Sequence, residues 1–598
     1  MSRAAAFVKP NNIFIKVPDV AEGDCQTVCQ YCNRCHSAEY RCSKRGTSYF
    51  TAAKRAEASF EHLSVVTNPN SQTLRTAVVT HYLGAMSQSC GYCRARSWFG
   101  EKMNCCRQGT VVFPMQTDVP QALSELILSY HVRQNIRSYN TVLAFASTGH
   151  NNKSFPDGTF VLGGRSYHRI GSVLPSANES HKFSQIWTLD THQATSRRLE
   201  IMPELRESVL QSLHEMMIQH NSLARMYKQA ACTIGNLPEA ERSAVGFTWH
   251  GSDDMSNFEI GAVLEGAGFQ RHITVKAHDG RLQKINDGHR LYHALAYPLL
   301  FPTGTSGWHY DLEFNGRKIS LTEYMRFLLM HRDTPTHVQR CERLALEYYC
   351  DAWAQVEARN MMFHKLATQQ AKYASASARS IMDQLHADNA HVIGTPIILP
   401  SSFPNGPRYY HNLYLDAIAL PRKFGKPDLF ITMTANPAWK EITEAIPAGS
   451  HWTHHQDIVA RVFYLKLKSM MDVIVKKKLF GEVLAYVFRI EWQARGMPHA
   501  HILIILKNKI LSPRHIDAVV WAEIPCPTKY PVLHNIVMKR MIHTPCDTNP
   551  DSHCRKKSND GSCYRYYPKD FNTVTSVVGN HVPIELFDSD IDGIISRC

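Results

Sequence analysis

The sequence predicts an α+β protein, in which an antiparallel sheet with flanking helices follows a cysteine-rich region and a mixed β/α region. Cysteines cluster near the N-terminus, and residues 320–385 have helical periodicity. After residue 395 the pattern changes to the alternating and apolar runs that are typical of strands. These observations, with a length of 598 residues at about 150 residues per domain, indicate several domains.

The composition narrows the classes of function. The chain has 66 Lys and Arg against 52 Asp and Glu, a net charge of +14, and this surplus favours a polyanion as partner. No apolar run approaches the roughly 18–20 residues of a membrane helix, and the N-terminus lacks the apolar core of a secretory signal. We therefore expect neither a membrane span nor secretion. In that setting, 17 cysteines favour free thiols or metal ligands over disulfides.

The first part, residues 1–115, is predicted to be a cysteine-rich, DNA-binding region in which cysteines bind zinc. A C-x2-C pair is followed twelve residues later by two adjacent cysteines, which is close to the spacing of a zinc ribbon. Adjacent cysteines point in different directions on a strand, so both can bind one ion only if they lie in a turn. The alternative is a set of buried thiols. The cysteines of this second cluster are Cys90, Cys93, Cys105 and Cys106, and those of the first are Cys25, Cys29, Cys32, Cys35 and Cys42.

Two parts follow before the predicted sheet core. Residues 116–305 are expected to mix short strands with helices, including one helix over residues 202–230 with a core-facing apolar stripe. Residues 306–395 are expected to form a helical lead-in. Ser320 and Glu323 have the spacing of a capping box at the start of its first helix.

Residues 396–510 are predicted to form the sheet core. We expect a short helix at 414–420, a strand ending at Asn436 and a helix at 457–477, then strands at 483–492 and 499–506 joined by a turn. His499 and His501 are two residues apart on the last strand, so both imidazoles project from one face. Two neutral imidazoles on one face can bind a divalent metal and leave positions open for a phosphate. The alternative is a pair of ordinary histidines in a hairpin.

The stretch around these histidines, EWQARGMPHAHILIIL, resembles the metal-binding core of the Rep domain of Helitron rolling-circle transposases, also called the Helitron helicase-like domain. Other segments are similar to the family's motifs in the same order, so the similarity extends over most of residues 60–575. These segments include CGYC and NCC, AYPLLFPTGTSGWHYDL, LPSSFPNGPRYY, RKFGKPDLFITMTANPAWKEI, VWAEIP, MIHTPC and CYRYYPKDF.

The resemblance implies an HUH-type endonuclease fold, with an antiparallel sheet and flanking helices, for residues 396–510. In that family a tyrosine attacks a metal-bound phosphodiester and forms a 5′-phosphotyrosyl intermediate, which conserves the bond energy for rejoining. His499 and His501 correspond to the ligands of Mg²⁺ or Mn²⁺. Glu491 or Gln493 would supply a further oxygen, and both remain open. Thr434 and Asn436 are candidates for lining the site.

This sequence departs from the family near its end. The family's tyrosines lie four residues apart on a helix beyond the histidines, and the chain ends at Cys598 before such a segment. We therefore expect the catalytic nucleophile to be missing. The sequence also contains no G-x-x-x-x-G-K-[ST] motif, so we expect no ATP site, and the helicase part would belong to a full-length relative.

The C-terminal segment, residues 511–598, contains a third candidate zinc site and, together with the sheet core, candidate DNA contacts. The alternatives are a polar loop and solvated lysines. The zinc candidates are His543, Cys546, Cys554 and Cys563, and the candidates for binding single-stranded DNA phosphates are Lys476, Lys477, Lys478, Lys556 and Lys557.

The predicted function is that of a fragment of a Helitron-type transposase, a class that nicks and joins single-stranded DNA at transposon ends, with the nucleus as the expected location. The activity is expected to be incomplete, and the chain inactive alone, because the nucleophilic tyrosines and the helicase are absent. The prediction includes a divalent metal at the histidine pair, structural zinc at the cysteines and no membrane partner. The alternative is a non-catalytic, zinc-containing protein that binds single-stranded DNA and derives from a transposon. A protein-interaction module rich in cysteine is a third and weaker interpretation.

Overall fold

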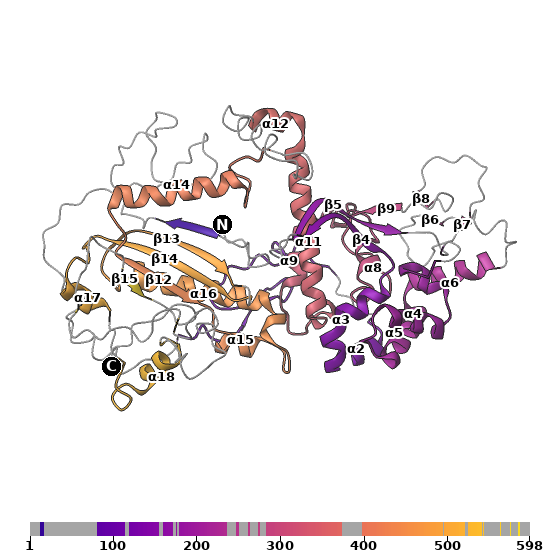
Figure 1. Cartoon of the computed structure of the whole chain (residues 1–598), viewed down its shortest axis with the longest axis horizontal. Helices are drawn as coiled ribbons and strands as arrows, with labels where there is room; N and C mark the ends of the chain where they lie inside the picture. Colours follow the sequence, from indigo (N-terminus) through magenta and orange to yellow (C-terminus); the bar gives the residue numbers. More distant parts are fainter. Residues whose placement is uncertain are drawn as a thin grey trace. The chain divides into compact units, whose positions relative to one another are not determined.

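The computed structural model describes residues 12–16, 81–113, 119–154, 160–170, 179–235, 247–249, 261–262, 273–275, 283–373, 398–493, 496–520, 524–540 and 584–586, and the single positions 175, 542, 563 and 575. The described residues fall into two compact units. One comprises residues 86–398, and the other combines residues 399–598 with residues 81–85 and strand β1 (Asn12–Lys16). Helices and small antiparallel sheets occur together, which confirms the α+β class (Figure 1).

The first unit is mainly helical and is organised around one large apolar core. Tyr139, Phe145, Trp187 and Tyr227 are among its fully buried aromatic side chains, and Phe145 stacks between Trp187 and Tyr227. The helices are α2 (Gln121–Leu126), α3 (Tyr130–Leu143), α4 (Thr191–Ile201), α5 (Glu207–His220), α6 (Ser222–Gly235), α8 (Tyr292–Ala296), α9 (Leu321–Leu329), α10 (His337–Arg340), α11 (Arg343–Lys365) and α12 (Ala367–Tyr373), with the 3-10 turn η1 (Phe183–Thr188).

The prediction of one helix over residues 202–230 is wrong, because Asn221 divides this segment into α5 and α6. The Asn221 backbone is extended, and its side-chain oxygen accepts hydrogen bonds from the N–H groups of Leu223 and Ala224. Asparagine is favoured at such a position because its side chain satisfies donors at a helix start that lack a helical partner. The capping box at Ser320 and Glu323 is confirmed at the start of α9.

Short antiparallel sheets complete the first unit. One three-stranded sheet has the order β4 (Ser147–Ser154), β5 (Phe160–Ile170) and β9 (Gln283–Asn286). Another has the order β7 (Gly261–Ala262), β6 (Phe247–Trp249) and β8 (Ile273–Val275). Two-stranded hairpins pair β2 (Gln88–Ser89) with β3 (Arg96–Ser97), and β10 (Glu313–Phe314) with β11 (Arg317–Lys318). The first of these hairpins carries the cysteine cluster that is described below.

The second unit is built on a five-stranded sheet in the order β1-β13-β14-β12-β15. β13 (Val483–Trp492) and β14 (Pro498–Leu506) form an antiparallel hairpin, and β12 (Leu429–Thr434) pairs antiparallel with β14. β15 (Ile584–Leu586) runs parallel to β12 at the edge. The two predicted strands at 483–492 and 499–506 are confirmed, with Pro498 added to the second.

Helices lie on both sides of this sheet. α14 (Pro407–Phe424) packs against β13 and β1, and α16 (Gln456–Val475) packs against β14 from the other side (Figure 1). α14 is longer than the predicted helix at 414–420, because Pro407 suits its first turn and Gly425, with φ +84°, ends it. The remaining helices are α15 (Lys440–Ala445), α17 (Pro513–Val519) and α18 (Pro531–Arg540), with the 3-10 turn η3 (Trp452–His454). Among the described helices, none is long and apolar enough to cross a membrane.

Candidate metal centres

The register of the sheet gathers polar side chains on one face of β12, β14 and β13. Because alternate residues of a strand share a face and paired residues of neighbouring strands lie side by side, two rows cross this face. One row contains Thr432, His501 and Arg489, and the next contains Thr434, His499 and Glu491. At the opposite end of the strands α14 covers the same face, where Leu420 packs with Ala485 and Ile505.

His499, His501 and Glu491 converge on one point of this face. The two histidine Nε2 atoms are 3.0 Å apart, and Oε2 of Glu491 lies 3.4 Å from Nε2 of His499 and 3.7 Å from Nε2 of His501. In an octahedral shell, two adjacent ligand atoms at about 2.1 Å from the ion are about 3.0 Å apart. The separation of the imidazole nitrogens therefore fits a shared divalent cation, and a carboxylate oxygen is close enough to complete a facial set.

The environments of the two histidines differ. His499 is 8% exposed, and burial lowers its pKa, which keeps the ring neutral and able to bind a metal. Its Nδ1 has no hydrogen-bond partner among the described residues. His501 has Nδ1 at 3.1 Å from Oγ1 of Thr432, and its ring stacks on Phe430 with 5.4 Å between centroids.

The structure separates Glu491 from Gln493 as candidates for the third ligand. Glu491 pairs directly with His499 across the hairpin. Gln493 lies beyond the last strand pair, where its backbone N–H donates to Met497 and its carbonyl accepts from Gly496. The geometry therefore favours Glu491.

The two candidates for lining the site also differ in position. Thr434 lies on the metal-facing side of β12, in register with His499. The side-chain oxygen of Asn436 accepts the backbone N–H of Ala438, so it stabilises the turn that follows β12.

The turn between β13 and β14 fixes the position of the histidine pair at the end of the sheet. Gly496 has φ +82°, a conformation that residues with a Cβ rarely adopt. A Cβ at this position would lie 3.1 Å from Nε2 of Gln456, the first residue of α16. The turn thus needs glycine for its backbone conformation and for its close approach to α16.

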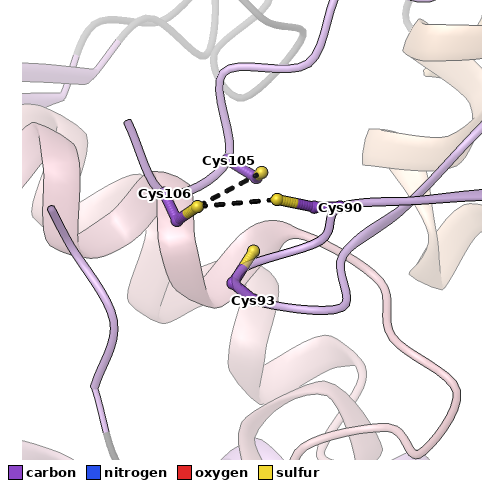
Figure 2. A group of neighbouring side chains, drawn as sticks. All are labelled: Cys90, Cys93, Cys105 and Cys106. Atoms are coloured by element: carbon purple, nitrogen blue, oxygen red, sulfur yellow. Dashed lines mark hydrogen bonds between the residues drawn. The ribbon is translucent and has the colours of Figure 1, made fainter. Parts of the chain in front are cut away.

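A second convergent group lies in the other unit, where Cys90, Cys93, Cys105 and Cys106 direct their sulfurs toward one another (Figure 2). The Sγ atoms of Cys90 and Cys106 are 3.6 Å apart, and those of Cys105 and Cys106 are 3.9 Å apart. Four sulfurs bound tetrahedrally at about 2.3 Å from zinc are about 3.8 Å from one another. These two separations fit a tetrahedral zinc site, and all four sulfurs lie within 4.8 Å of one another.

Two tight loops bring these sulfurs together. After Cys93, Arg94 has φ +59° and its N–H donates to the carbonyl of Cys90. After Cys106, three successive residues have positive φ, and the N–H of Gly109 donates to Sγ of Cys106 at 3.3 Å. The adjacent cysteines therefore lie in a bend that precedes a turn, as simultaneous ligation requires.

Burial and close approach give the thiols of Cys93, Cys105 and Cys106 different pKa values. A hydrogen bond from Cys105 lowers the pKa of Cys93 to about 5, whereas that same bond raises the pKa of Cys105 well above its usual range. Burial raises the pKa of Cys106 to about 11. Cys93 ionises readily, whereas Cys105 and Cys106 resist ionisation, so a divalent cation would be needed to favour the thiolate form of these two.

The lysine cluster predicted to bind DNA is not beside the histidines. Lys476, Lys477 and Lys478 are exposed just after α16, before β13 begins, and Lys476 pairs with Asp472 at 2.8 Å. From Val483 to Glu491 the strand extends about 26 Å, so this cluster lies toward the opposite end of the sheet.

Most of the other predicted site residues lie outside the described part of the chain. These are Cys25, Cys29, Cys32, Cys35, Cys42, His543, Cys546, Cys554, Lys556 and Lys557. Cys563 is described and buried.

Thr432, Arg489 and Phe430 were not predicted from the sequence to lie at this site. Thr432 and Phe430 have the same strand parity as Thr434, and Arg489 has the same parity as Glu491. The alternation along each strand was therefore a usable signal. The register that places them beside His501 was not available from the sequence.

A sheet face that presents two imidazoles and a carboxylate is typical of proteins that bind a divalent metal. Residues 324–504 match the family described as the Helitron helicase-like domain at the N-terminus. The match covers a little under a third of the chain and includes both histidines and Glu491. It confirms the resemblance for these residues and indicates a transposon-related function. No curated protein matches the chain.

Proposed function

We propose that this chain is part of a Helitron-type transposase that nicks and rejoins single-stranded DNA, and that it supplies the metal site of that reaction, with a divalent metal held by Glu491, His499 and His501, while the tyrosine nucleophile expected in that family is not found in this sequence. The sheet that carries these residues would then be an HUH endonuclease core. The observation that supports this proposal most is the convergence of two imidazole nitrogens and a carboxylate oxygen within 3.7 Å. A divalent metal at this point would polarise the phosphodiester and stabilise the charge that develops on it.

Arg489 adds a second reason to expect a phosphate at this face. It lies in the same row as His501, its side chain is 45% exposed, and its Nε is 3.1 Å from Oε1 of Glu491. The other carboxylate oxygen, Oε2, is the one closest to the histidines. A guanidinium group in this position can hold Glu491 and still offer N–H groups to a phosphate oxygen.

The second candidate function is non-catalytic binding of single-stranded DNA by a protein that contains structural zinc. The group of four cysteines favours this function, because it provides a complete ligand set for structural zinc, and binding zinc requires no catalytic step. The two candidates differ in the part they give to the histidine pair.

Binding of a fluorescent single-stranded oligonucleotide, followed by anisotropy, distinguishes the two. The zinc-loaded whole chain is titrated with and without Mn²⁺ and compared with the variant His499→Ala/His501→Ala. The transposase proposal expects Mn²⁺ to strengthen binding by the unmodified chain and not by the variant. Binding that depends on salt but is the same for both proteins with and without Mn²⁺ supports the non-catalytic function.

The nicking step has its own test. Denaturing gels of the same mixtures reveal whether a covalent protein–DNA adduct forms, and mass spectrometry identifies the residue that carries the DNA. An adduct on a tyrosine, formed with Mn²⁺ and lost in the double variant, supports nicking. If neither this chain nor a full-length relative that carries the tyrosine pair gives an adduct, the nicking proposal is wrong.

A further inference from the structure

We infer that Thr432 is a positioning residue for the metal centre, because it fixes the protonation and the orientation of His501. This inference rests on the proposed metal site. Thr432 lies on β12, which pairs with β14, the strand that carries both histidines. The register of this pairing places Thr432 directly opposite His501.

The two nitrogens of the His501 ring have different surroundings. Nε2 faces the convergence point, at 3.0 Å from Nε2 of His499 and 3.7 Å from the Glu491 carboxylate. To bind a metal, Nε2 must be unprotonated, so a neutral ring carries its proton on Nδ1. Nδ1 lies 3.1 Å from Oγ1 of Thr432, so in this tautomer it donates a hydrogen bond to that oxygen.

The second constraint on the ring is apolar. Phe430 stacks on His501 with an angle of 16° between the ring planes. This contact restricts the plane of the ring, but it does not distinguish one ring nitrogen from the other. Among the contacts described for His501, the hydrogen bond to the Thr432 hydroxyl is the one that disfavours the flipped ring, in which Nδ1 would face the metal site.

His499 provides an internal comparison. Its Nδ1 is buried and has no partner among the described residues, so no hydrogen bond at that nitrogen orients the ring. The ring of His501 is more exposed, with 36% of its side chain accessible, and therefore has more freedom to turn. A hydrogen bond that orients a ligand contributes most where packing constrains the ring least.

The test is the affinity for Mn²⁺ of the zinc-loaded whole chain, measured by isothermal titration calorimetry. Thr432→Val keeps the shape of the side chain and removes the oxygen, and Thr432→Ser keeps the oxygen. Loss of an outer hydrogen bond of this kind typically lowers metal affinity by about 10- to 100-fold. We expect such a loss for Thr432→Val and near-normal affinity for Thr432→Ser.

Thr443→Val is the matched control, because Thr443 lies on α15 and its hydroxyl bonds only to the carbonyl of Lys440 among the contacts described. It should leave Mn²⁺ affinity unchanged. If Thr432→Val binds Mn²⁺ as tightly as the unmodified chain, or Thr432→Ser is as weak as Thr432→Val, the inference is wrong. If Mn²⁺ binding by the unmodified chain does not depend on His499 and His501, the proposed metal site itself is wrong.

Discussion

The Nε2 atoms of His499 and His501 face each other across 3.0 Å on one face of β14. The strand places both rings on this face, and the neighbouring strands add Glu491 and Thr432 to it. Two unprotonated imidazole nitrogens this close repel each other, so a proton or a cation between them stabilises the arrangement. Burial of His499 disfavours the protonated form, which leaves a cation as the better stabilising partner.

The cysteine group predicts a bound zinc ion in the first unit. Cys90→Ser combined with Cys106→Ser removes two of four ligands, so the variant should hold one zinc fewer per chain, measured by elemental analysis after dialysis. Cys350→Ser is the control, because Cys350 is exposed on α11. Equal zinc content in the double variant and the unmodified chain would show that these sulfurs do not hold the metal.

A buried ion pair in the second unit should be important for stability. Lys466 lies 2.8 Å from Glu441, and both side chains are almost fully buried. Lys466→Met would leave the carboxylate buried without its cation, which should cost about 3–5 kcal/mol of unfolding free energy in urea. Replacing Glu441 by Leu in the same chain should recover most of that loss.

The control for this pair is Lys476→Met, which removes an exposed pair with Asp472. We expect it to change the unfolding free energy by about 1 kcal/mol or less. Similar losses for the two single variants would contradict the importance of the buried pair.

His214 predicts a loss of stability in acid. Burial lowers its pKa to about 3, and Arg198 donates to its Nδ1 at 2.8 Å, which requires an unprotonated nitrogen there. The unfolded chain, in which this histidine has an ordinary pKa near 6.5, therefore takes up the proton first as the pH falls. Between roughly pH 6 and pH 4 this residue should remove about 1.4 kcal/mol of stability per pH unit.

The measurement is urea unfolding at several pH values for the unmodified chain and for His214→Gln. The unfolding free energy of the variant should depend less steeply on pH over this range. His411→Gln, at an exposed histidine of α14, should keep the original slope. Identical slopes for the unmodified chain and His214→Gln would contradict the buried, neutral state of His214.

The sequence was informative where local pattern decides structure. The alternation in residues 483–492 and 499–506 predicted both strands, and the two-residue spacing placed both histidines on one face. It could not decide between Glu491 and Gln493, because both have the same strand parity. The register that pairs Glu491 with His499 makes that distinction.

Other features depended on contacts far apart in the chain. Thr432 reaches His501 across 69 residues, through a pairing that no local pattern specifies. The break between α5 and α6 was missed for a local reason, because apolar spacing continues through Asn221 while its side chain caps the new helix.

Calorimetric titration with Mn²⁺ measures whether His499 and His501 hold a divalent metal. The chain is first given one equivalent of zinc, which thiolates bind in preference to imidazoles, so that the cysteines do not compete for Mn²⁺ and excess zinc does not occupy the histidines, and His411→Ala serves as a control. We predict one Mn²⁺ per chain for the unmodified protein and the control, and none for His499→Ala/His501→Ala. Equal Mn²⁺ binding by the double variant and the unmodified chain would contradict metal binding by these two histidines.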